Sequence, residues 1–393
     1  MTTLAQEISS ADRSGNEAPG FEIEVLKGLS NFLDLRVEWD ELHKRAATPH
    51  HVFQSHSFLR HWAEQYLDDK ARLFIICGRV GNQLAMVWPL VVTRRFGVDV
   101  LTFMGAPTAQ FFDVLVDNLE RWTLLLNAGW SEISTLRADI FVGTNIRSDA
   151  LIHSCTAMCP IELPGRTTAP YAKLCLRVEG EDPGPAYSAR ERSNYRRRLR
   201  RAAEYGEISF SCLRPGAQAS ALALKATSFK QRSLLSKSIW SPTVSNPKFG
   251  GFFEHLAGDP DASLRVSTIN CDDKEIGIEL SFDCGGHTFG HVLATDPDSP
   301  VEGIGSVLVH RAFISATARG THTFEMMAPA DQYKMPHADG ETPVSNLAVA
   351  FTPKGRLYRD LYLRKVQPVA KALAQRFAAP LIARMLQNRE AQD

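Results

Sequence analysis

The sequence predicts an α+β protein of two domains, each with a mixed, mostly antiparallel sheet flanked by helices, followed by a helical tail. Three observations predict this class. The 393 residues suit two domains of ordinary size, both halves combine helical patterns with strand hairpins, and a proline- and glycine-rich stretch over 160–186 separates them. The expected divisions are a disordered lead-in over 1–20, domains over 21–165 and 166–356, and a tail over 357–393.

The first domain is expected to begin with a strand, because apolar and charged residues alternate over Phe21–Leu26. Two helical patterns and a strand-rich centre follow, with a hairpin turn near Gly81. The predicted helices are Asn31–Lys44, Ser57–Leu67 and Leu119–Leu126, and the further predicted strands are Leu73–Val80, Leu84–Thr93, Val98–Phe103, Phe112–Val116 and Ile133–Leu136.

The second domain opens on a helix whose capping box is Ser188–Glu191 and which ends near Gly206. Seven arginines between Arg190 and Arg201 surround a narrow apolar stripe on this helix. The pattern then predicts strands over Ile208–Leu213, Leu264–Asn270, Glu275–Phe282, Thr288–Ala294, Thr323–Met327 and Leu347–Phe351. It predicts helices over Ala219–Arg232, Phe249–Leu256 and Gly303–Arg319, and a long loop over Ser233–Lys248. The chain is expected to end in an amphipathic tail helix over Leu357–Leu386, bent at Pro368.

Composition narrows the classes of function. Basic and acidic residues number 44 each, so the formal net charge of zero gives no argument for DNA or an anionic membrane. The seven cysteines form no zinc-like or C-x-x-C pattern, which favours buried free thiols, no metal site and a reducing compartment. The first twenty residues lack the features of a secretory signal, and no apolar stretch is long enough for a membrane span. A cytoplasmic location is therefore expected.

One segment carries the chemistry. The strand Thr288–Ala294 leads through a turn containing Gly303-Ile304-Gly305 into a helix that continues from Ser306. Glycines at a helix entrance let a ligand approach the backbone, and the free N–H groups there favour an anion such as a pyrophosphate. A plain structural turn is the alternative.

The turn resembles the donor site of the GNAT acetyltransferase superfamily, whose pattern is R/Q-x-x-G-x-G/A after the fourth strand. Ser299–Ser306 matches the glycine spacing, but Pro300 stands where Arg or Gln is expected. This resemblance implies acetyl-CoA or another acyl-CoA as co-substrate and no metal. It implies donor contacts from Val292, Ala294, Gly303, Ile304, Gly305 and Ser306.

The chain also resembles the narrower CelD/BcsL-type (BioF2-like) acetyltransferase family, over about residues 21–355. The matching features, in order, are Phe53–Trp62, Trp88-Pro89-Leu90, the arginine-rich helix, Ser299-Pro300 with the glycines, and Phe324-Glu325-Met326 through Tyr333-Lys334. Departures are Glu325 for Asp, Ala330 for Gly and a longer donor turn. The resemblance implies acyl transfer in exopolysaccharide, cellulose or cell-envelope metabolism, with a small-molecule or saccharide acceptor and peripheral contact with the polysaccharide-synthesis machinery.

Acyl transfer needs a base, an oxyanion-binding N–H group and an acid. The expected catalytic residues are Glu279, His291 and Tyr333, and Val292–Ala294 correspond to the strand that supplies the oxyanion contact. The expected substrate contacts are Asp113, Arg196, Arg200, Asp331 and Lys334. Most of these residues have a structural alternative. Glu279 would be a paired carboxylate, His291 a histidine satisfied within the sheet, and Asp113 and Asp331 a capping acid and a turn acid. Lys334 and the two arginines would be solvated charges. The hairpin leaves open which residue of Thr288–Ala294 faces Glu279.

Two other functions fit the same residues. The family is similar to the Fem-type peptidoglycan-bridge transferases, in which a Phe-Lys pair occupies the place of Tyr333-Lys334, so an aminoacyl-tRNA-dependent transferase is one alternative. Few aromatic residues for base stacking surround the arginine-rich helix, which disfavours RNA. A non-catalytic assembly partner in polysaccharide production is the other alternative, because Pro300 departs from the donor pattern.

Overall fold

The computed structural model describes residues 20–117, 122–378 and 380. It forms two compact units, each described by itself. Unit 1 comprises the described parts of Met1–Ala63, Leu67–Gly165 and Ser345–Arg364, and unit 2 those of Glu64–Tyr66, Arg166–Val344 and Lys365–Asp393. Residues 1–19 of the predicted lead-in over 1–20 and the end of the predicted tail lie outside the described residues.

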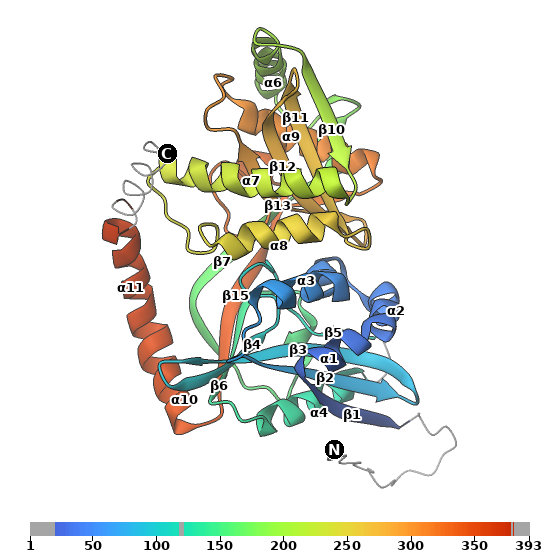
Figure 1. The fold of residues 1–393 in the computed structure, drawn as a ribbon, viewed down its shortest axis with the longest axis vertical. Helices are drawn as coiled ribbons and strands as arrows, with labels where there is room; N and C mark the ends of the chain where they lie inside the picture. Colours follow the sequence, from blue (N-terminus) through green and yellow to red (C-terminus); the bar gives the residue numbers. More distant parts are fainter. Residues whose placement is uncertain (1–19, 118–121, 379, 381–393) are drawn as a thin grey trace. The chain divides into compact units, whose positions relative to one another are not determined.

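Unit 1 is built on the sheet β1-β2-β3-β4-β6 (Figure 1). Strands β1 to β4 pair antiparallel in succession, whereas β6 runs parallel to β4 after the crossover helix α4. Its elements are β1 (Phe21–Lys27), α1 (Gly28–Asp34), α2 (Arg36–Ala46), η1 (Pro49–Gln54), α3 (His56–Tyr66), β2 (Arg72–Val80), β3 (Gln83–Arg95), β4 (Val98–Phe103), β5 (Leu115–Val116), α4 (Trp122–Thr135), β6 (Ile140–Arg147) and η2 (Leu151–Ser154).

Unit 2 is built on the sheet β7-β14-β13-β12-β11-β10. Strands β10 to β13 pair antiparallel in succession, and β14 runs parallel to β13 after the crossover helix α9. Its elements, with two strands that begin or end in unit 1, are β7 (Ile161–Lys173), α5 (Leu174–Arg177), β8 (Val178–Glu179), β9 (Asp182–Pro183), α6 (Ala189–Ala202), β10 (Ile208–Leu213), α7 (Ala217–Ser236), α8 (Pro247–Gly258), β11 (Leu264–Cys271), β12 (Lys274–Cys284), β13 (His287–Thr295), α9 (Ile304–Ala318), β14 (Thr323–Glu325), η3 (Met335–His337) and β15 (Gly340–Ala350).

Both units therefore repeat one order: a strand, helices, three antiparallel strands, a crossover helix, and a strand parallel to the third. In unit 1 this order is β1, α1–α3, β2–β4, α4, β6, and in unit 2 it is β10, α7–α8, β11–β13, α9, β14. The predicted α+β class of two tandem domains with mixed, mostly antiparallel sheets is confirmed.

The two sides of the unit 2 sheet are covered by different helices. Helix α9 packs on one side, where Leu308 meets the backbone of Gly277 and Ile304 joins a cluster with Ile269. Helices α7 and α8 cover the other side, where Phe253 of α8 contacts Phe282. A Cβ on Gly277 would lie 3.6 Å from Leu308, which is ordinary van der Waals contact.

One predicted element is wrong, and one strand was not predicted. Residues Ile133–Leu136 were expected as a strand, but α4 runs to Thr135 and the strand follows as β6. A short apolar run does not distinguish a strand from a buried helical turn. The proline-rich stretch 160–186 was expected only as a crossover between the domains, and it contains the thirteen-residue strand β7. Strand β7 pairs with both β15 and β14 in the sheet, and this pairing overrides the low strand propensity of Pro164 and Pro170.

The tail helix, defined as Pro353–Ala378, is continuous in backbone and changes its winding. It comprises α10 (Pro353–Leu357), the wide π-helical η4 (Tyr358–Val366), α11 (Gln367–Leu373) and the π-helical η5 (Ala374–Ala378). No helix among the described residues has the length and apolar character needed to cross a bilayer.

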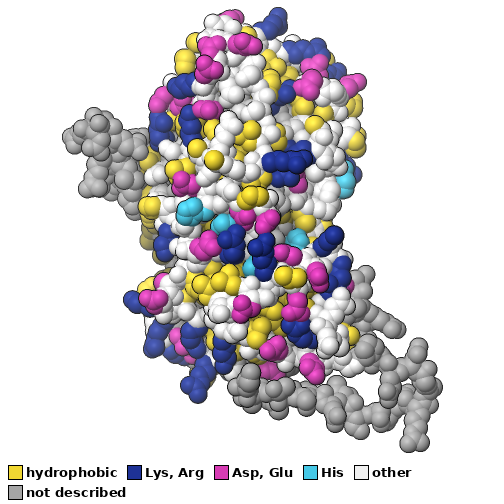
Figure 2. Space-filling model, turned by 45° about the vertical axis from the view of Figure 1, so that its right-hand side comes forward, with side chains coloured by type: hydrophobic (Ala, Val, Ile, Leu, Met, Phe, Trp, Pro, Cys, Tyr) yellow, Lys and Arg dark blue, Asp and Glu magenta, His cyan; other side chains and the backbone are white. Residues whose placement is uncertain are grey.

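The surface chemistry agrees with the composition. Acidic and basic side chains are mixed over the face drawn in Figure 2, in keeping with a net charge of zero. All seven cysteines are free, but only Cys77 and Cys155 are buried, so the expectation of buried thiols is wrong for the other five.

Candidate active site

The turn from β13 into α9 has the shape expected of an anion-binding site. Gly303 has φ +77° immediately before α9, a left-handed conformation that favours glycine, and no side chain caps the helix. A Cβ at Gly305 would have only Thr295 Cγ2 nearby, at 3.9 Å. The first-turn N–H groups of a helix lack intrahelical partners and attract anions. The turn thus combines open space with donors.

Arg198 of α6 lies directly on this turn. Its Nη1 donates to Ser306 Oγ at 2.6 Å, and its Nε lies 3.1 Å from the position a Cβ on Gly303 would take. Neither predicted arginine reaches the turn in this way: Arg196 is exposed and pairs with Asp182 at 3.1 Å, and Arg200 is exposed.

A sequence signal for Arg198 existed but was weak. Tyr195 and Ala202 are buried on α6 and Leu199 packs beside them. Arg198 is three residues after Tyr195, so it flanks the buried stripe, whereas Arg196 and Arg200 point elsewhere around the helix.

Strand β13 has a long stretch beyond its pairing with β14. The two strands pair only over His287–Phe289, but β13 continues to Thr295. A bulge also shifts its register against β12 between Leu280 and Ser281. The predicted donor-strand residues Val292 and Ala294 lie in this stretch, with buried side chains. Bulges commonly re-aim backbone groups beside active sites.

Glu279 is opposite Leu293 on β13, which settles the register that the hairpin left open. Its side chain is 1% exposed, and Oε1 has no hydrogen-bond partner among the described residues. Ser267 is its cross-strand neighbour on β11, and Ser281 follows two residues on. Burial raises the pKa of Glu279 to about 7, against the attraction of Arg319. This carboxyl can therefore gain and lose a proton near neutral pH.

His291 lies on the other side of the sheet. Its ring centroid is 4.9 Å from that of Phe253 on α8 and 5.9 Å from that of Phe282. Glu279 shares its side with Gly277, which contacts α9. The two predicted bases therefore cannot act together on one acceptor atom.

The segment after β14 holds three predicted residues. Tyr333 is 53% exposed, and burial of its hydroxyl raises the pKa of Tyr333 to about 12. Lys334 is buried, and its Nζ donates to the carbonyl oxygens of Met327 and Pro329 at 3.0 and 2.7 Å. It also lies 3.4 Å from the half-exposed carboxylate of Asp331. The ammonium of Lys334 thus stabilises the loop between Met327 and Lys334.

Lys230 of α7 is a cation that sequence reasoning missed. Its Nζ is 3.5 Å from the carbonyl oxygen of Leu293, in the stretch of β13 beyond its pairing with β14. Burial lowers the pKa of Lys230, and repulsion from Lys237 adds to this effect. The sequence signal is its spacing of four from Ala226, a buried position of α7. A lysine on the apolar face of a helix is unusual enough to single out.

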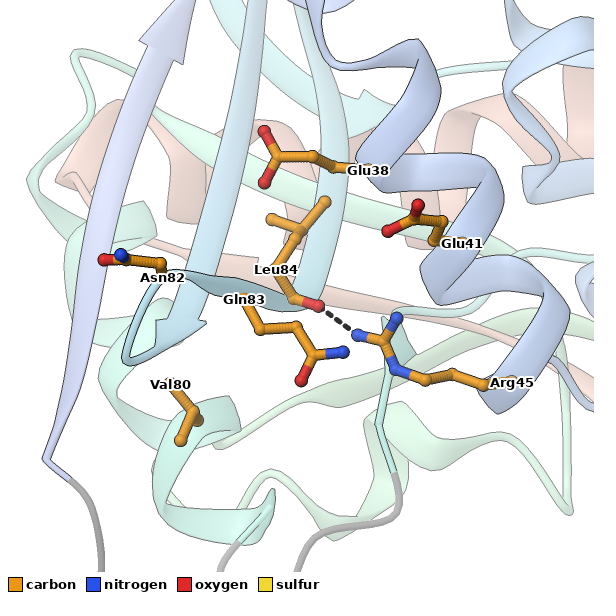
Figure 3. A pocket seen from close by; sticks show the side chains of 7 residues that line it. All are labelled: Glu38, Glu41, Arg45, Val80, Asn82, Gln83 and Leu84. Atoms are coloured by element: carbon orange, nitrogen blue, oxygen red, sulfur yellow. Dashed lines mark hydrogen bonds between the residues drawn. The ribbon is translucent and has the colours of Figure 1, made fainter.

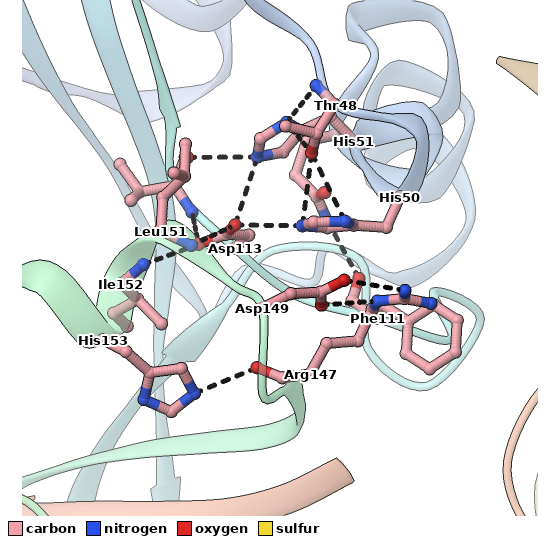
Figure 4. A network of polar contacts seen from close by, with 12 residues as sticks. Thr48, His50, His51, Phe111, Asp113, Arg147, Asp149, Leu151, Ile152 and His153 are labelled. Atoms are coloured by element: carbon pink, nitrogen blue, oxygen red, sulfur yellow. Dashed lines mark hydrogen bonds and ion pairs between the residues drawn. The ribbon is translucent and has the colours of Figure 1, made fainter. Parts of the chain in front are cut away.

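Asp113 belongs to a buried network in unit 1 (Figure 4). Its side chain is 0% exposed, and it accepts hydrogen bonds from the N–H groups of Leu151 and Ile152 at 2.7 and 2.9 Å. His50 Nε2 lies 3.0 Å away. Burial opposes ionisation, yet the hydrogen bonds from His50 and His51 outweigh it and hold the pKa of Asp113 well below its ordinary value.

This network fits a structural hub rather than the predicted substrate contact. Both carboxylate oxygens of Asp113 are engaged, so a substrate would have to break native hydrogen bonds. His50, His51 and Asp113 also lie close enough to suggest a metal site. However, His51 Nδ1 accepts from Thr48 N–H, which places its proton on Nε2, beside the carbonyl oxygen of Val114 at 3.1 Å. That nitrogen then has no lone pair for a metal.

A separate cavity of about 390 Å³ opens in unit 1 between α2 and the β2–β3 turn (Figure 3). Arg45 spans its mouth, donating to the carbonyl oxygen of Leu84 and to Asp117. Glu38 and Glu41, on the same helix α2 as Arg45, also line the cavity. None of the predicted site residues lines this cavity.

The comparisons agree with this geometry. Residues 189–335 match the family model described as an acetyltransferase (GNAT) domain, so this part of the chain is a GNAT-type domain. The match contains α6, β13, the glycine turn and β14. No curated protein sequence is significantly similar to the chain.

Three solved structures share the fold. A conserved protein of unknown function from Bacteroides thetaiotaomicron is 9% identical, with a TM-score of 0.54 over 81% of this chain and 97% of that one. FemX is 10% identical, with a TM-score of 0.51 over 76% and 92%. L-PGS from Bacillus licheniformis is 12% identical, with a TM-score of 0.50 over 81% and 91%. At these identities the likeness shows the fold alone, and the repeated order of elements makes both units GNAT-like.

Proposed function

We propose that the protein is an acyl-CoA-dependent acyltransferase that transfers an acyl group, most simply acetyl, directly to a nitrogen or oxygen of its acceptor. The observation that carries this proposal is the open, Gly303-led entrance to α9 directly after β13, with Arg198 lying across it. The match of residues 189–335 to an acetyltransferase domain supports it.

The donor would bind along β13 and the turn. The N–H groups of Ile304 and Gly305 would bind a pyrophosphate at the helix N-terminus. The N–H of Ser306 donates to the carbonyl oxygen of Gly303 at 3.2 Å, so Ser306 would contact the donor through its hydroxyl. Pro300 provides no polar side chain, and Arg198 provides the positive charge at the same turn. The backbone of Val292–Ala294, beyond the last pair with β14, would stabilise the oxyanion that forms at the thioester carbonyl.

The proton steps follow from the side chains nearby. The acceptor loses its proton to a base, its nitrogen or oxygen bonds to the acyl carbon, the carbon–sulfur bond breaks, and the thiolate takes a proton from Tyr333 or solvent. Glu279 and His291 are alternative bases, because they lie on opposite sides of the sheet. The raised pKa of Glu279 suits a base at neutral pH.

With His291 as the base, the acceptor would approach from the side of the sheet that α7 and α8 cover. Lys230 there provides N–H donors beside Leu293. Asp331 and Lys334 border the same region, since the carboxylate of Asp331 raises the pKa of Lys230 and the charge of Lys230 lowers the pKa of Lys334. The exposed side chains of Arg196 and Arg200 are further contacts for an anionic acceptor. The resemblance to the CelD/BcsL-type family supports a saccharide acceptor in exopolysaccharide or cell-envelope metabolism and a cytoplasmic enzyme.

Calorimetric titration with acetyl-CoA tests the donor site. We expect wild type to bind and Gly305→Val to lose at least about 10-fold in affinity, because the new side chain occupies open space at the turn. Gly303→Val should also lose binding. Gly320→Val is the matched control, since Gly320 has φ +83° at the other end of α9 and should keep affinity despite equal backbone strain.

The result also separates the alternatives. Absence of acetyl-CoA binding to folded wild type would overturn the proposal. Binding of aminoacyl-tRNA instead would favour the Fem-type alternative, for which the likeness to FemX shows only a shared fold. Binding of neither donor would favour a non-catalytic assembly partner.

A further inference from the structure

The tail helix leaves large apolar side chains in solvent. Its buried side chains, Tyr358 and Leu363, belong to η4 and join a core cluster of unit 1, whereas α11 buries no residue. The exposed apolar side chains are Leu357 (64%), Leu361 (51%), Val366 (45%), Val369 (59%), Leu373 (52%) and Phe377 (59%).

These six side chains follow the winding of the helix. From Leu357 through Leu361 to Val366 the spacing is four and then five residues, which matches the wide π-helical turns of η4. From Val366 onward the spacing is three, four and four, which suits α11 and the π-helical turn after it. The change of spacing with the change of winding keeps the six residues on one apolar stripe.

The same helix is strongly basic, although the chain as a whole is neutral. Between Pro353 and Ala378 the only acidic residue is Asp360. Seven residues are basic, namely Lys354, Arg356, Arg359, Arg364, Lys365, Lys371 and Arg376. All but Arg359 are exposed.

An exposed aromatic ring adjoins the helix in unit 1. Phe96, in the turn between β3 and β4, is 80% exposed, and its ring centroid lies 5.1 Å from that of Tyr362. Arg94 and Arg95 precede it in the chain. An apolar ring flanked by cations repeats the chemistry of the tail helix beside it.

We propose that the tail helix binds the surface of an anionic phospholipid bilayer. The α11 part of the helix buries no residue, and a helix of this kind is marginal in water by itself, so a partner surface would stabilise it. An apolar stripe on a cationic helix is the pattern that inserts at the headgroup boundary, where the stripe leaves water and the lysines and arginines meet lipid phosphates. This surface is independent of the acyltransferase proposal.

Co-sedimentation of the full chain with vesicles tests the charge component. We expect binding to vesicles of equal phosphatidylglycerol and phosphatidylcholine, and much weaker binding to phosphatidylcholine alone. Changing Lys365, Lys371 and Arg376 to Glu should lower partitioning on the order of 100-fold. The matched control carries three charge reversals on exposed residues of α6, at Arg190, Arg197 and Arg201, and should bind as wild type.

A second variant tests the apolar stripe. Changing Val369, Leu373 and Phe377 to Ser should lower partitioning on the order of 10-fold or more at unchanged charge. The matched control changes exposed apolar residues of unit 1 to Ser, at Leu29, Leu33 and Val37. Circular dichroism of each variant checks folding.

Three outcomes would overturn the proposal. They are no binding of wild type to anionic vesicles, equal binding to neutral vesicles, and tail variants that bind as wild type. Sedimentation velocity without lipid provides a further check. Self-association that the Ser variant abolishes, with no vesicle binding, would assign the stripe to a second copy of this chain instead.

Discussion

Replacing Glu279 by Gln should change the pH dependence of stability, because Glu279 is buried with a raised pKa. The pKa of this carboxyl rises from its ordinary value of 4.5 to about 7 through burial. The folded state therefore holds the proton more tightly than the unfolded state. Stability from this group is fully present below pH 4.5 and is lost as the pH rises through about 7. Glutamine does not titrate. The free energy of unfolding of the variant, relative to that of wild type, should therefore rise by about 2–3 kcal/mol from pH 5 to pH 8.

The assay must report on unit 2. Five of the six tryptophans lie in unit 1, so total fluorescence would follow mainly the other unit. We would equilibrate wild type and Glu279→Gln in urea at pH 5 and pH 8. A hydrogen-exchange pulse at one fixed pH, read by mass spectrometry of peptides from β12, then gives the fraction unfolded.

Glu275→Gln is the matched control on the same strand. Glu275 pairs with Lys225 at 2.5 Å, and although burial opposes ionisation, the hydrogen bond from Lys225 lowers the pKa of Glu275. The contribution of Glu275 to the free energy of unfolding is therefore present above its ordinary pKa and is lost as the pH falls. This pH dependence has the opposite sign to that of Glu279. A Glu279→Gln effect that is the same at pH 5 and pH 8 would refute the reasoning, because it would mean that Glu279 is ionised when folded.

Arg198→Ala should weaken acetyl-CoA affinity roughly 10-fold in calorimetry, since it removes a charge-assisted phosphate contact; an equal loss in Arg197→Ala, an exposed neighbour, would contradict this. Lys230→Met should lower kcat/KM for the acceptor at least about 10-fold with donor affinity unchanged, whereas the exposed Lys237→Met should not. Asp113→Asn should destabilise unit 1 by about 2–4 kcal/mol in urea unfolding followed by tryptophan fluorescence, and unchanged stability would exclude the hub role.

Local signals in the sequence predicted most of unit 2. The capping box at Ser188 is present with both hydrogen bonds, because it involves only residues three apart. Gly303 has the left-handed conformation that a glycine before a helix suggested. The strands β11 to β13 fall within a few residues of their predicted bounds, since alternation is itself a local property.

Contacts between distant segments escaped prediction. The strand β7 depends on pairing with β15 and β14, both more than one hundred residues later in the chain, and local propensity argued against it. Asp113 looked like a candidate ligand until Leu151 and Ile152 were seen to donate to it. A carboxylate in sequence carries no sign of which N–H groups will surround it.

The sequence by itself determined the architecture and the location of the glycine turn, because helix and strand periodicity and glycine conformation depend on near neighbours. The tertiary structure alone decided which side chains share a site. The β13 bulge places His291 on the side opposite Glu279, since a shift of one residue in a strand exchanges its faces. Packing of α6 against α9 selects Arg198 from seven arginines, because only the position beside the buried stripe reaches the turn.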